Sequence, residues 1–353
     1  MPTDSQQLRV LILRLGAMGD ILHALPAVTA LRAKHPEWFI GWAVEPQWRG
    51  LLAAGDAEVR GRAMPIVDKL HLVPAKEWGR RPFSARTIEG VSQTRSELRA
   101  ERYDVCVDLQ GAVRSAMLGK WAHAHRLIGE EKPREWGARY LFDEHVATSG
   151  VHVIEQAVEV VNAIVREQLP TMPPSLPISE GAEQLCDARL AAFDGKPFVI
   201  LNPGAGWGAK RWPTERYGQV ARLFAERGFG VVINCGPGEE GLAAEVNAAS
   251  GNAALSLSPA LDELIAITRR SSLVIAGDTG PLHLASALGK PVVGIFGPTD
   301  PARNGPFGGS FRVLRHPESK RDHSRRAEPE AGLLTISACE VWSAAMELLE
   351  DAR

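Results

Sequence analysis

The sequence has 353 residues, a formal net charge of −2 and a hydrophobic fraction of 45%. This length suits two domains rather than one core, and the near-balanced charge gives no overall attraction to nucleic acid. A membrane-spanning helix needs about 18 consecutive apolar residues, and because no run in the chain is that long, we expect none.

The four cysteines show neither a Cys-x-x-Cys pair nor another metal-ligand spacing. We therefore expect reduced thiols in buried positions of a cytosolic protein, and no metal site. Residues 1–8 are polar, so no signal peptide is predicted either. The cysteines are Cys106, Cys186, Cys235 and Cys339.

The first half of the chain alternates short apolar runs with helical periodicity. Such alternation predicts a parallel sheet with helices on both faces. A long amphipathic helix over 151–165 closes this half, and another helix is expected to open at Arg134. The strands are expected at 8–13, 39–44, 69–73, 103–109 and 125–128.

The first strand runs into a turn that contains Gly16 and Gly19 and ends in Asp20. The turn lacks the third glycine of a dinucleotide fingerprint and the Lys-Ser/Thr pair of a P-loop, so neither nucleotide motif is predicted. Asp20 has two interpretations that the residues alone leave open. It caps the next helix, or it is a carboxylate at the carboxyl end of a strand, facing a ligand cleft.

The segment 76–83 interleaves cations with aromatic residues and is predicted to be a loop. Lys76, Arg80 and Arg81 are its cations. Such a loop suits an anionic partner or an anionic membrane surface.

The segment 169–177 has four prolines in nine residues and is the clearest linker. We therefore predict domains at 1–170 and 178–335, followed by a terminal helix at 336–353 that packs back toward the N-terminal domain. The second domain repeats the alternation, with strands expected at 198–201, 230–234, 273–276 and 291–296.

Four turns in the second domain are rich in glycine or proline and follow its strands. Parallel strands would bring these turns to one edge of the sheet, where ligands bind. In one of them, glycines flank Asp278 and Thr279, and Pro281 opens a helix whose N–H groups suit a phosphate. The alternative is that Asp278 and Thr279 only cap a structural helix. The turns are 202–208, 236–240, 277–281 and 297–301.

The same edge is expected to carry charges that suit a nucleoside diphosphate. Lys210 lies among glycines and tryptophans, which favours a site lysine over a surface one. Either Glu239 or Glu240 would meet the ribose hydroxyls. His283, one turn into the helix, is the kind of residue that more often packs than catalyses.

Taken together, five stretches resemble glycosyltransferase family 9, the bacterial ADP-heptose:lipopolysaccharide heptosyltransferases, and within it the heptosyltransferase I group. The stretches run in the family's order and span nearly the whole chain. They are 10–27, 108–111, 210–213, 277–283 and 297–301.

The resemblance implies the GT-B fold: two Rossmann-like domains whose parallel sheets face each other across a central cleft. It implies an N-terminal acceptor-binding domain and a C-terminal nucleotide-sugar-binding domain. The implied reaction is inverting transfer of heptose from ADP-heptose to the Kdo-containing inner core of lipopolysaccharide. Asp20 would be the general base, while Lys210 and the helix start at 278–280 would stabilise the diphosphate leaving group.

The resemblance also supplies two sets of binding residues. The implied donor-binding residues are Asn202, Gly204, Lys210, Glu239, Glu240, Asp278, Thr279, Gly280 and His283. The implied acceptor-binding residues are Gly19, His23, Lys76, Arg80, Arg81, Gln110, Arg114 and Arg134.

No cofactor or metal is implied; the ADP-sugar is a co-substrate, and positive charge for the leaving group comes from Lys210 and the helix start. The implied partner is a Kdo-lipid A type acceptor, which places the enzyme in the cytoplasm, peripherally at the cytoplasmic face of the inner membrane, with no role for nucleic acid. Three alternatives stay open: a family member with another sugar or acceptor, a non-catalytic nucleotide-binding protein, and, disfavoured by the missing fingerprint, an NAD-dependent dehydrogenase.

Overall fold

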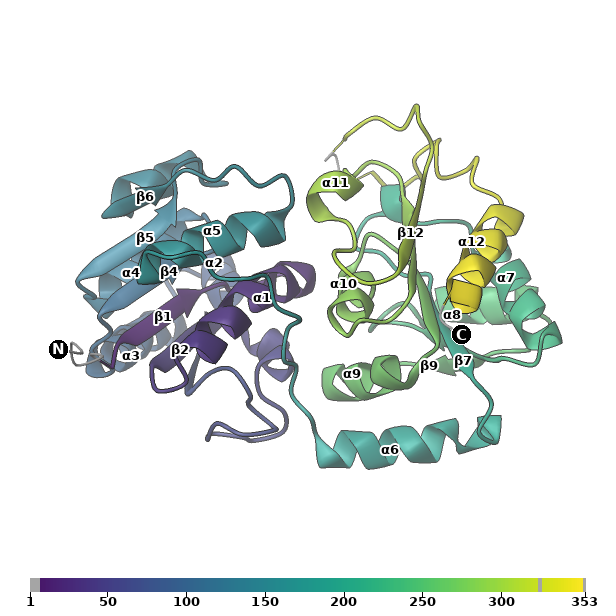
Figure 1. Cartoon of the computed structure of the whole chain (residues 1–353), viewed down its shortest axis with the longest axis horizontal. Coiled ribbons are helices and arrows are strands. Elements are labelled where there is room, and N and C mark those ends of the chain that lie inside the picture. The colour runs from purple at the N-terminus through teal and green to yellow at the C-terminus, as the bar shows by residue number, and fades with distance from the viewer. Residues whose placement is uncertain (1–6, 323–325, 352–353) are drawn as a thin grey trace. The chain divides into compact units, whose positions relative to one another are not determined.

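The computed structural model describes residues 7–322 and 326–351, and the chain divides into two compact units, 1–177 and 178–353 (Figure 1). The division falls at the end of the proline-rich segment 169–177. Each unit is an α/β sandwich built on one parallel sheet, as the alternation of elements predicts.

The central strands of the first sheet bury their apolar side chains on both faces, whereas the edge strands are partly exposed. The strands are β1 (Arg9–Leu13), β2 (Phe39–Val44), β3 (Lys69–Leu72), β4 (Val105–Asp108), β5 (Arg126–Glu130) and β6 (Glu144–Val146). All pair in parallel in the order β3-β2-β1-β4-β5-β6. The order reverses direction between β1 and β4, which makes that point the topological switch of the sheet.

Helices cover both faces of the first sheet. They are α1 (Met18–Lys34), α2 (Ala75–Arg80), α3 (Ala85–Ala100), α4 (Val113–Ala122) and α5 (Val153–Val165), with 3-10 turns η1 (Pro46–Leu51) and η2 (Trp136–Leu141). Helix α1 packs against α5, and α3 packs against α4. The loop predicted over 76–83 is wrong for residues 76–80, because they belong to α2. The helix predicted to begin at Arg134 is also wrong, because the chain forms only the short 3-10 turn η2 there.

The second sheet repeats this topology. Its strands are β7 (Phe198–Asn202), β8 (Gly230–Asn234), β9 (Leu255–Leu257), β10 (Leu273–Gly277), β11 (Val292–Phe296) and β12 (Phe311–Arg315). They pair in parallel in the order β12-β11-β10-β7-β8-β9, which is the order of the first sheet when read from the other edge. The switch point of this sheet lies between β7 and β10.

Helices of the second unit pack in two groups, α7 with α8 and α12, and α6 with α9. They are α6 (Glu180–Leu190), α7 (Thr214–Glu226), α8 (Glu240–Ala249), α9 (Leu261–Arg270), α10 (Gly280–Ala287), α11 (Pro301–Asn304) and α12 (Ala338–Asp351), with 3-10 turns η3 (Ala191–Phe193) and η4 (Gly208–Lys210).

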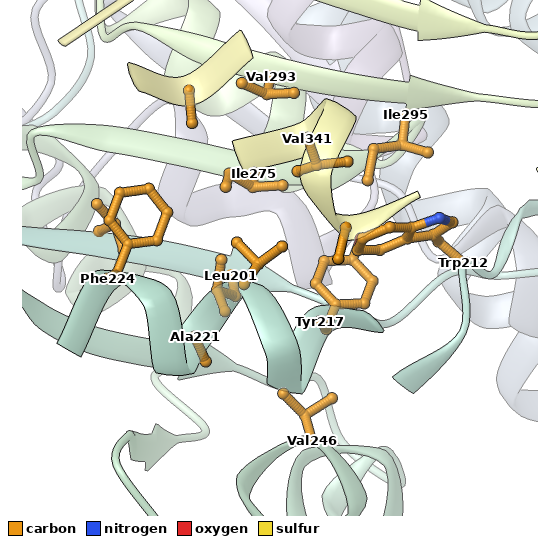
Figure 2. Packing of buried hydrophobic residues seen from close by; sticks show 14 of the residues in the cluster. Leu201, Trp212, Tyr217, Ala221, Phe224, Val246, Ile275, Val293, Ile295 and Val341 are labelled. Carbon is orange, nitrogen blue, oxygen red and sulfur yellow. The ribbon is translucent and has the colours of Figure 1, made fainter. Parts of the chain in front are cut away.

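The terminal helix α12 belongs to the second unit. Figure 2 shows its Val341 packed with Leu201, Ile275 and Ile295 of the sheet, in a core that includes Trp212 of the β7–α7 connection. The apolar face of this helix is therefore buried on the sheet of its own unit.

The cysteines follow the expectation at three positions, since Cys106, Cys186 and Cys235 are buried. Cys339, in the first turn of α12, is exposed.

Candidate active site

Several of the predicted site residues, among them Asp20, Asn202 and Asp278, lie in or beside turns at the switch points of the two sheets. In the first sheet Leu13 pairs with Asp108, so the turns after β1 and β4 are neighbours. In the second, Ala276 pairs with Asn202, so the turns after β10 and β7 are neighbours. Ligands of open parallel sheets bind at such points, beyond the carboxyl ends of the strands.

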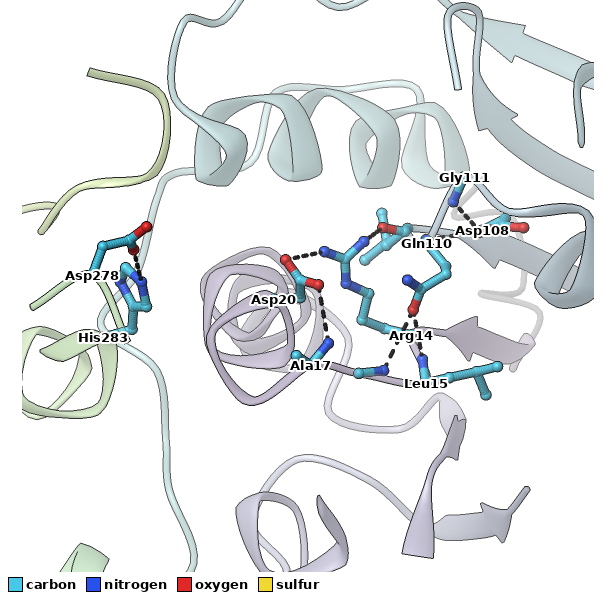
Figure 3. A network of polar contacts seen from close by, with 11 residues as sticks. Arg14, Leu15, Ala17, Asp20, Asp108, Gln110, Gly111, Asp278 and His283 are labelled. Atoms are coloured by element: carbon cyan, nitrogen blue, oxygen red, sulfur yellow. Dashed lines mark hydrogen bonds and ion pairs between the residues drawn. The ribbon is translucent and has the colours of Figure 1, made fainter. Parts of the chain in front are cut away.

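The Asp20 carboxylate is held by two contacts in the β1–α1 turn (Figure 3). Its Oδ2 accepts a hydrogen bond of 3.0 Å from the N–H of Ala17, and its Oδ1 lies 2.9 Å from Nη2 of Arg14. Asp20 therefore does cap the helix, from its third position. The side chain nevertheless remains 40% exposed, so the carboxylate is both oriented and accessible.

Arg14 joins the two turns of the first switch point. Its guanidinium pairs with Asp20 and also donates to the carbonyl of Leu109, which follows β4. Only 15% of the Arg14 side chain is exposed, and its Nε has no hydrogen-bond partner among the described residues. Sequence analysis did not select Arg14; a cation directly after a buried strand was the available signal.

The Asp108 carboxylate organises the β4–α4 turn from inside the protein. Its Oδ1 accepts from the N–H groups of Gln110 and Gly111 at 2.7 and 2.8 Å, and its Oδ2 accepts from Ser115 Oγ at 2.8 Å. Burial raises the pKa of Asp108 to about 6, although these hydrogen bonds oppose the shift. Asp108 is thus a buried support of the turn rather than an exposed ligand.

Gln110 transmits this support to the neighbouring turn. Its Oε1 accepts from the N–H of Leu15 at 3.0 Å and of Gly16 at 3.4 Å (Figure 3). Gln110 is buried, so its carbonyl oxygen is occupied by the fold. Asp108 therefore fixes the backbone of Gln110, and Gln110 in turn fixes the β1–α1 turn that carries Asp20.

Three of the residues implied for the acceptor lie beside these turns. The N–H of Lys76 donates to Glu45, whose own N–H donates to the carbonyl of Leu15, so α2 starts next to the β1–α1 turn. A Cβ on Gly111 would lie 2.9 Å from the backbone nitrogen of Arg134, which brings that arginine to the β4–α4 turn. Arg114 is exposed in the first turn of α4.

The other implied acceptor residues differ in their surroundings. Gly19 lies in the first turn of α1, beside Asp20. His23 is buried and meets the ring of His152 edge-on at 5.5 Å between ring centroids. Arg80 and Arg81 are exposed at the end of α2.

In the second unit the β10–α10 turn leads from a buried strand directly into a helix, as the sequence predicts. Helix α10 begins at Gly280, with Thr279 at the cap position and Pro281 in the first turn. The first N–H groups of a helix have no partner within it and carry partial positive charge, which suits an anion. Thr279 Oγ1 also lies 3.4 Å from Nδ2 of Asn202, so the β7 turn contacts this one directly.

Asp278 is the centre of a buried charged cluster. Its Oδ2 lies 2.6 Å from Lys210 Nζ, and its Oδ1 lies 3.1 Å from His283 Nε2. Burial opposes ionisation of this carboxyl, but the hydrogen bonds and charges of His283 and Lys210 outweigh it, and the pKa of Asp278 falls well below its usual range. Asp278 therefore stays ionised and fixes the lysine ammonium at the helix start.

Lys210 ends the turn η4, which is held from two sides. Its Nζ lies 4.6 Å from the centre of the Trp207 ring, a cation–π distance. The N–H of Ala209 donates to the carbonyl of Arg326 at 3.1 Å, and the carbonyl of Ala209 accepts from Glu330 at 3.2 Å. This backbone pairing with the segment after β12 fixes the position of the lysine.

Of the two candidate glutamates, Glu239 is placed within the turns. Its Oε2 accepts from the N–H of Gly236 at 2.9 Å, and a Cβ on Gly204 would lie only 2.0 Å from the same oxygen. Gly204 thus leaves room for this carboxylate. Glu240 is exposed and bonds to the N–H of Gly238.

Among the described residues, no group of three or more histidine, cysteine, aspartate and glutamate side chains is arranged to hold a metal ion. The helices in the described part of the chain also include none with the length and apolar character that crossing a bilayer requires.

Comparisons with known proteins identify the family of the chain. Residues 91–333, more than half of the chain, match the family described as glycosyltransferase family 9 (heptosyltransferase). The chain is 27% identical to lipopolysaccharide heptosyltransferase 1 of Pseudomonas aeruginosa, over 86% of this chain and 82% of the relative. It is 26% identical to lipopolysaccharide heptosyltransferase 1 of Escherichia coli K12, over 88% and 94%. The solved structure of E. coli heptosyltransferase WaaC with ADP-2-deoxy-2-fluoro heptose is similar with a TM-score of 0.73 and 25% identity, over 98% of this chain and 100% of that one.

Proposed function

This chain belongs to glycosyltransferase family 9, the heptosyltransferases, and we propose that it transfers heptose from ADP-heptose to the Kdo-containing inner core of lipopolysaccharide. The chain is a glycosyltransferase of the GT-B fold. The relatives that bear the name lipopolysaccharide heptosyltransferase 1 support the acceptor, and the WaaC structure with a fluorinated ADP-heptose supports the donor.

Asp20 activates the acceptor in the proposed reaction. Its carboxylate takes the proton from an acceptor hydroxyl while that oxygen forms a bond to the anomeric carbon of the donor sugar. Attack opposite to the departing phosphate inverts the anomeric configuration. The observation that carries this step is a carboxylate fixed by Arg14 and the Ala17 N–H and still 40% exposed.

Lys210 and the start of α10 receive the leaving group. The bond from the anomeric carbon to the β-phosphate oxygen breaks, and negative charge grows on the diphosphate of ADP. The lysine ammonium and the N–H of Gly280 offset this charge. Asp278 holds the lysine ammonium at 2.6 Å, and His283 lies 3.1 Å from the other oxygen of Asp278 and fixes that carboxylate, so little reorganisation is needed during the reaction.

Donor and acceptor recognition follow from the remaining polar groups. Glu239, among the turns beside Gly204, is the residue we assign to the ribose hydroxyls, in preference to the exposed Glu240. The acceptor sugar Kdo carries a carboxylate, and exposed arginines such as Arg114 and Arg134 suit it. A lipid-anchored acceptor places the enzyme in the cytoplasm, in peripheral contact with the inner membrane.

A direct assay tests the proposal. Purified protein is incubated with ADP-heptose and a Kdo-lipid A acceptor, and the product is analysed by mass spectrometry and by NMR of its anomeric carbon. We expect one added heptose with inverted configuration and release of ADP. Calorimetric titration with ADP-, UDP- and GDP-sugars in parallel identifies the donor, and tighter binding of a UDP-sugar would overturn the assignment.

A further inference from the structure

Two exposed apolar residues, Phe83 and Ile88, lie where α2 leads into α3 in the first unit. Phe83 is 91% exposed, the most exposed of the large apolar side chains in the described residues, and Ile88 is 61% exposed. We call residues 75–88 the α2–α3 corner. Large apolar side chains in open solvent are common singly, but an almost fully exposed phenylalanine beside an exposed isoleucine is a feature to explain.

The capping geometry of α3 brings the two side chains to the same end of that helix. Ser84 is the N-cap, and its Oγ accepts from the N–H of Thr87 at 3.2 Å. Phe83 and Ile88 occupy the positions before the cap and four residues into the helix, which pack together in a hydrophobic staple. A closed staple buries its phenylalanine. With 91% of Phe83 exposed, the staple is not closed here, and the apolar surface of Phe83 is open to another partner.

Cations surround the pair. The corner contains four basic residues against a single carboxylate, that of Glu77, whereas the whole chain has a net charge of −2. The Arg86 side chain is 88% exposed, and its ion pair with Glu77 is long, at 3.9 Å. The basic residues are Lys76, Arg80, Arg81 and Arg86, and all of them are exposed.

We propose that the α2–α3 corner docks the protein on an anionic phospholipid surface. Phe83 and Ile88 enter the region of the lipid head groups, while Arg80, Arg81 and Arg86 contact lipid phosphates. The inference rests on the proposed function for the presence of a bilayer, since the acceptor is lipid-anchored. Beyond that function, the inference identifies the α2–α3 corner as the segment that contacts the membrane.

A bilayer fits the corner better than a protein partner. Two apolar side chains fall far short of the roughly 800 Å² that each partner buries in a stable protein interface. A second copy of the chain would bring one basic corner against another, and like charges repel. A membrane requires only a small inserted apolar area, supplemented by about 1 kcal/mol for each basic residue near an anionic surface.

Sedimentation with lipid vesicles tests the proposal on the full chain, without substrate. Vesicles of phosphatidylcholine are compared with vesicles containing about one third phosphatidylglycerol. We expect wild-type protein to bind the anionic vesicles preferentially and to be released by high salt. The double variant Phe83→Ser/Ile88→Ser is expected to bind them about tenfold more weakly. Leu185→Ser, which removes a 46% exposed leucine from α6, should leave binding unchanged.

Two further measurements separate docking from catalysis and from misfolding. Transfer to a water-soluble acceptor without acyl chains, and calorimetric binding of ADP, should be unchanged in the double variant. If the wild type transfers no heptose but the variant loses vesicle binding, docking stands and the proposed function fails. If the variant sediments with anionic vesicles like wild type, or if only its self-association changes in analytical ultracentrifugation, the docking proposal is overturned.

Discussion

The β1–α1 and β10–α10 turns have the same construction but treat their carboxylates in opposite ways. Both turns follow a central strand at a switch point, and both place an aspartate at the start of a helix. The Asp20 side chain is 40% exposed and has one cationic neighbour, Arg14. The Asp278 side chain is 7% exposed and contacts both Lys210 and His283.

In the proposed mechanism, the difference separates a group that reacts from a group that positions. A general base must reach the proton it removes, so it requires an accessible oxygen. A buried carboxylate that binds two basic side chains has no accessible oxygen to offer and instead fixes its partners. The proposed mechanism therefore uses the same strand–turn–helix unit for two tasks, and it assigns the task by the burial of the aspartate.

Among the substitutions that test this comparison, we expect Asp20→Asn to have the largest effect, which is on kcat. The amide keeps the size of the side chain but cannot accept the acceptor's proton. We expect kcat to fall by about 10²–10⁴, while the affinity for ADP, measured by calorimetry, stays within about twofold of wild type because the donor turn is intact.

A matched control for Asp20→Asn is Asp104→Asn, which changes a carboxylate that accepts from the N–H of Arg9 at the amino end of the same sheet. Its kcat should match that of wild type. Equal turnover in the Asp20 variant would instead show that another group removes the proton.

We expect Asp278→Asn mainly to lower the free energy of unfolding. It leaves Lys210 and His283 without their buried counter-charge, and breaking such a cluster costs about 3 kcal/mol of unfolding free energy. Urea denaturation measures the loss. Glu347→Gln, which breaks an exposed ion pair with Arg312 in the same unit, should change stability by less than about 0.5 kcal/mol. Comparable losses of unfolding free energy in the two variants would show that the buried Asp278 cluster stabilises the fold no more than an exposed ion pair does.

Asp108→Asn tests a third carboxylate, buried like Asp278 but without a directly bonded cation. Because its folded-state pKa is raised to about 6, its contribution to stability is present below about pH 4 and is lost as pH rises through 6. Wild type should lose about 2 kcal/mol from this group between pH 4 and pH 7, and the variant should not.

Urea denaturation at both pH values measures this difference for Asp108→Asn. The variant also loses hydrogen bonds at every pH, so only the change between the two pH values is informative. Asp143→Asn, which removes a carboxylate that accepts from the N–H of Leu127, is the control for that pH-independent loss. An unchanged pH dependence in the Asp108 variant would contradict the prediction.

We expect Gly208→Ala to have the smallest effect, and it tests whether the position of Lys210 matters for kcat. A Cβ there would lie 1.6 Å from the carbonyl oxygen of Ala327, so η4 must shift and carry Lys210 with it. We expect kcat to fall about tenfold, since misplacing a charge at the leaving group weakens its stabilisation. Gly206→Ala has open space around its Cβ and should be neutral in the same assay. Equal kcat values for the two variants would show that the close approach of Gly208 to Ala327 does not determine the position of Lys210.

The alternation of strands and helices was predictable because buried parallel strands form continuous apolar runs and the turns between them are rich in glycine and proline. The edge strands β6, β9 and β12 were not predicted, since two of them have three residues each and none is continuously apolar. The segment of helix α2 was predicted to be a loop because it interleaves cations with aromatic residues, but that composition does not exclude a short helix, and Pro74 stands at its cap position.

The site was predictable in its charged residues and not in their pairing. Asp20, Lys210 and Asp278 stand in turns whose composition marks them. That Arg14 contacts Asp20, or that Gln110 supports the first turn, depends on which strands are neighbours and in what register, and single-sequence patterns carry no such information. The choice between Glu239 and Glu240 likewise needed the position of Gly204.

The placement of α12 on its own sheet has a consequence for how the protein is made. Each sheet is drawn from one continuous stretch of chain, and α12 completes the second core rather than the first. The first unit therefore has all of its strands once residue 146 has left the ribosome. Domains generally fold as units during synthesis, so we expect the N-terminal unit to become protease-resistant on stalled ribosomes while the second unit is still being translated.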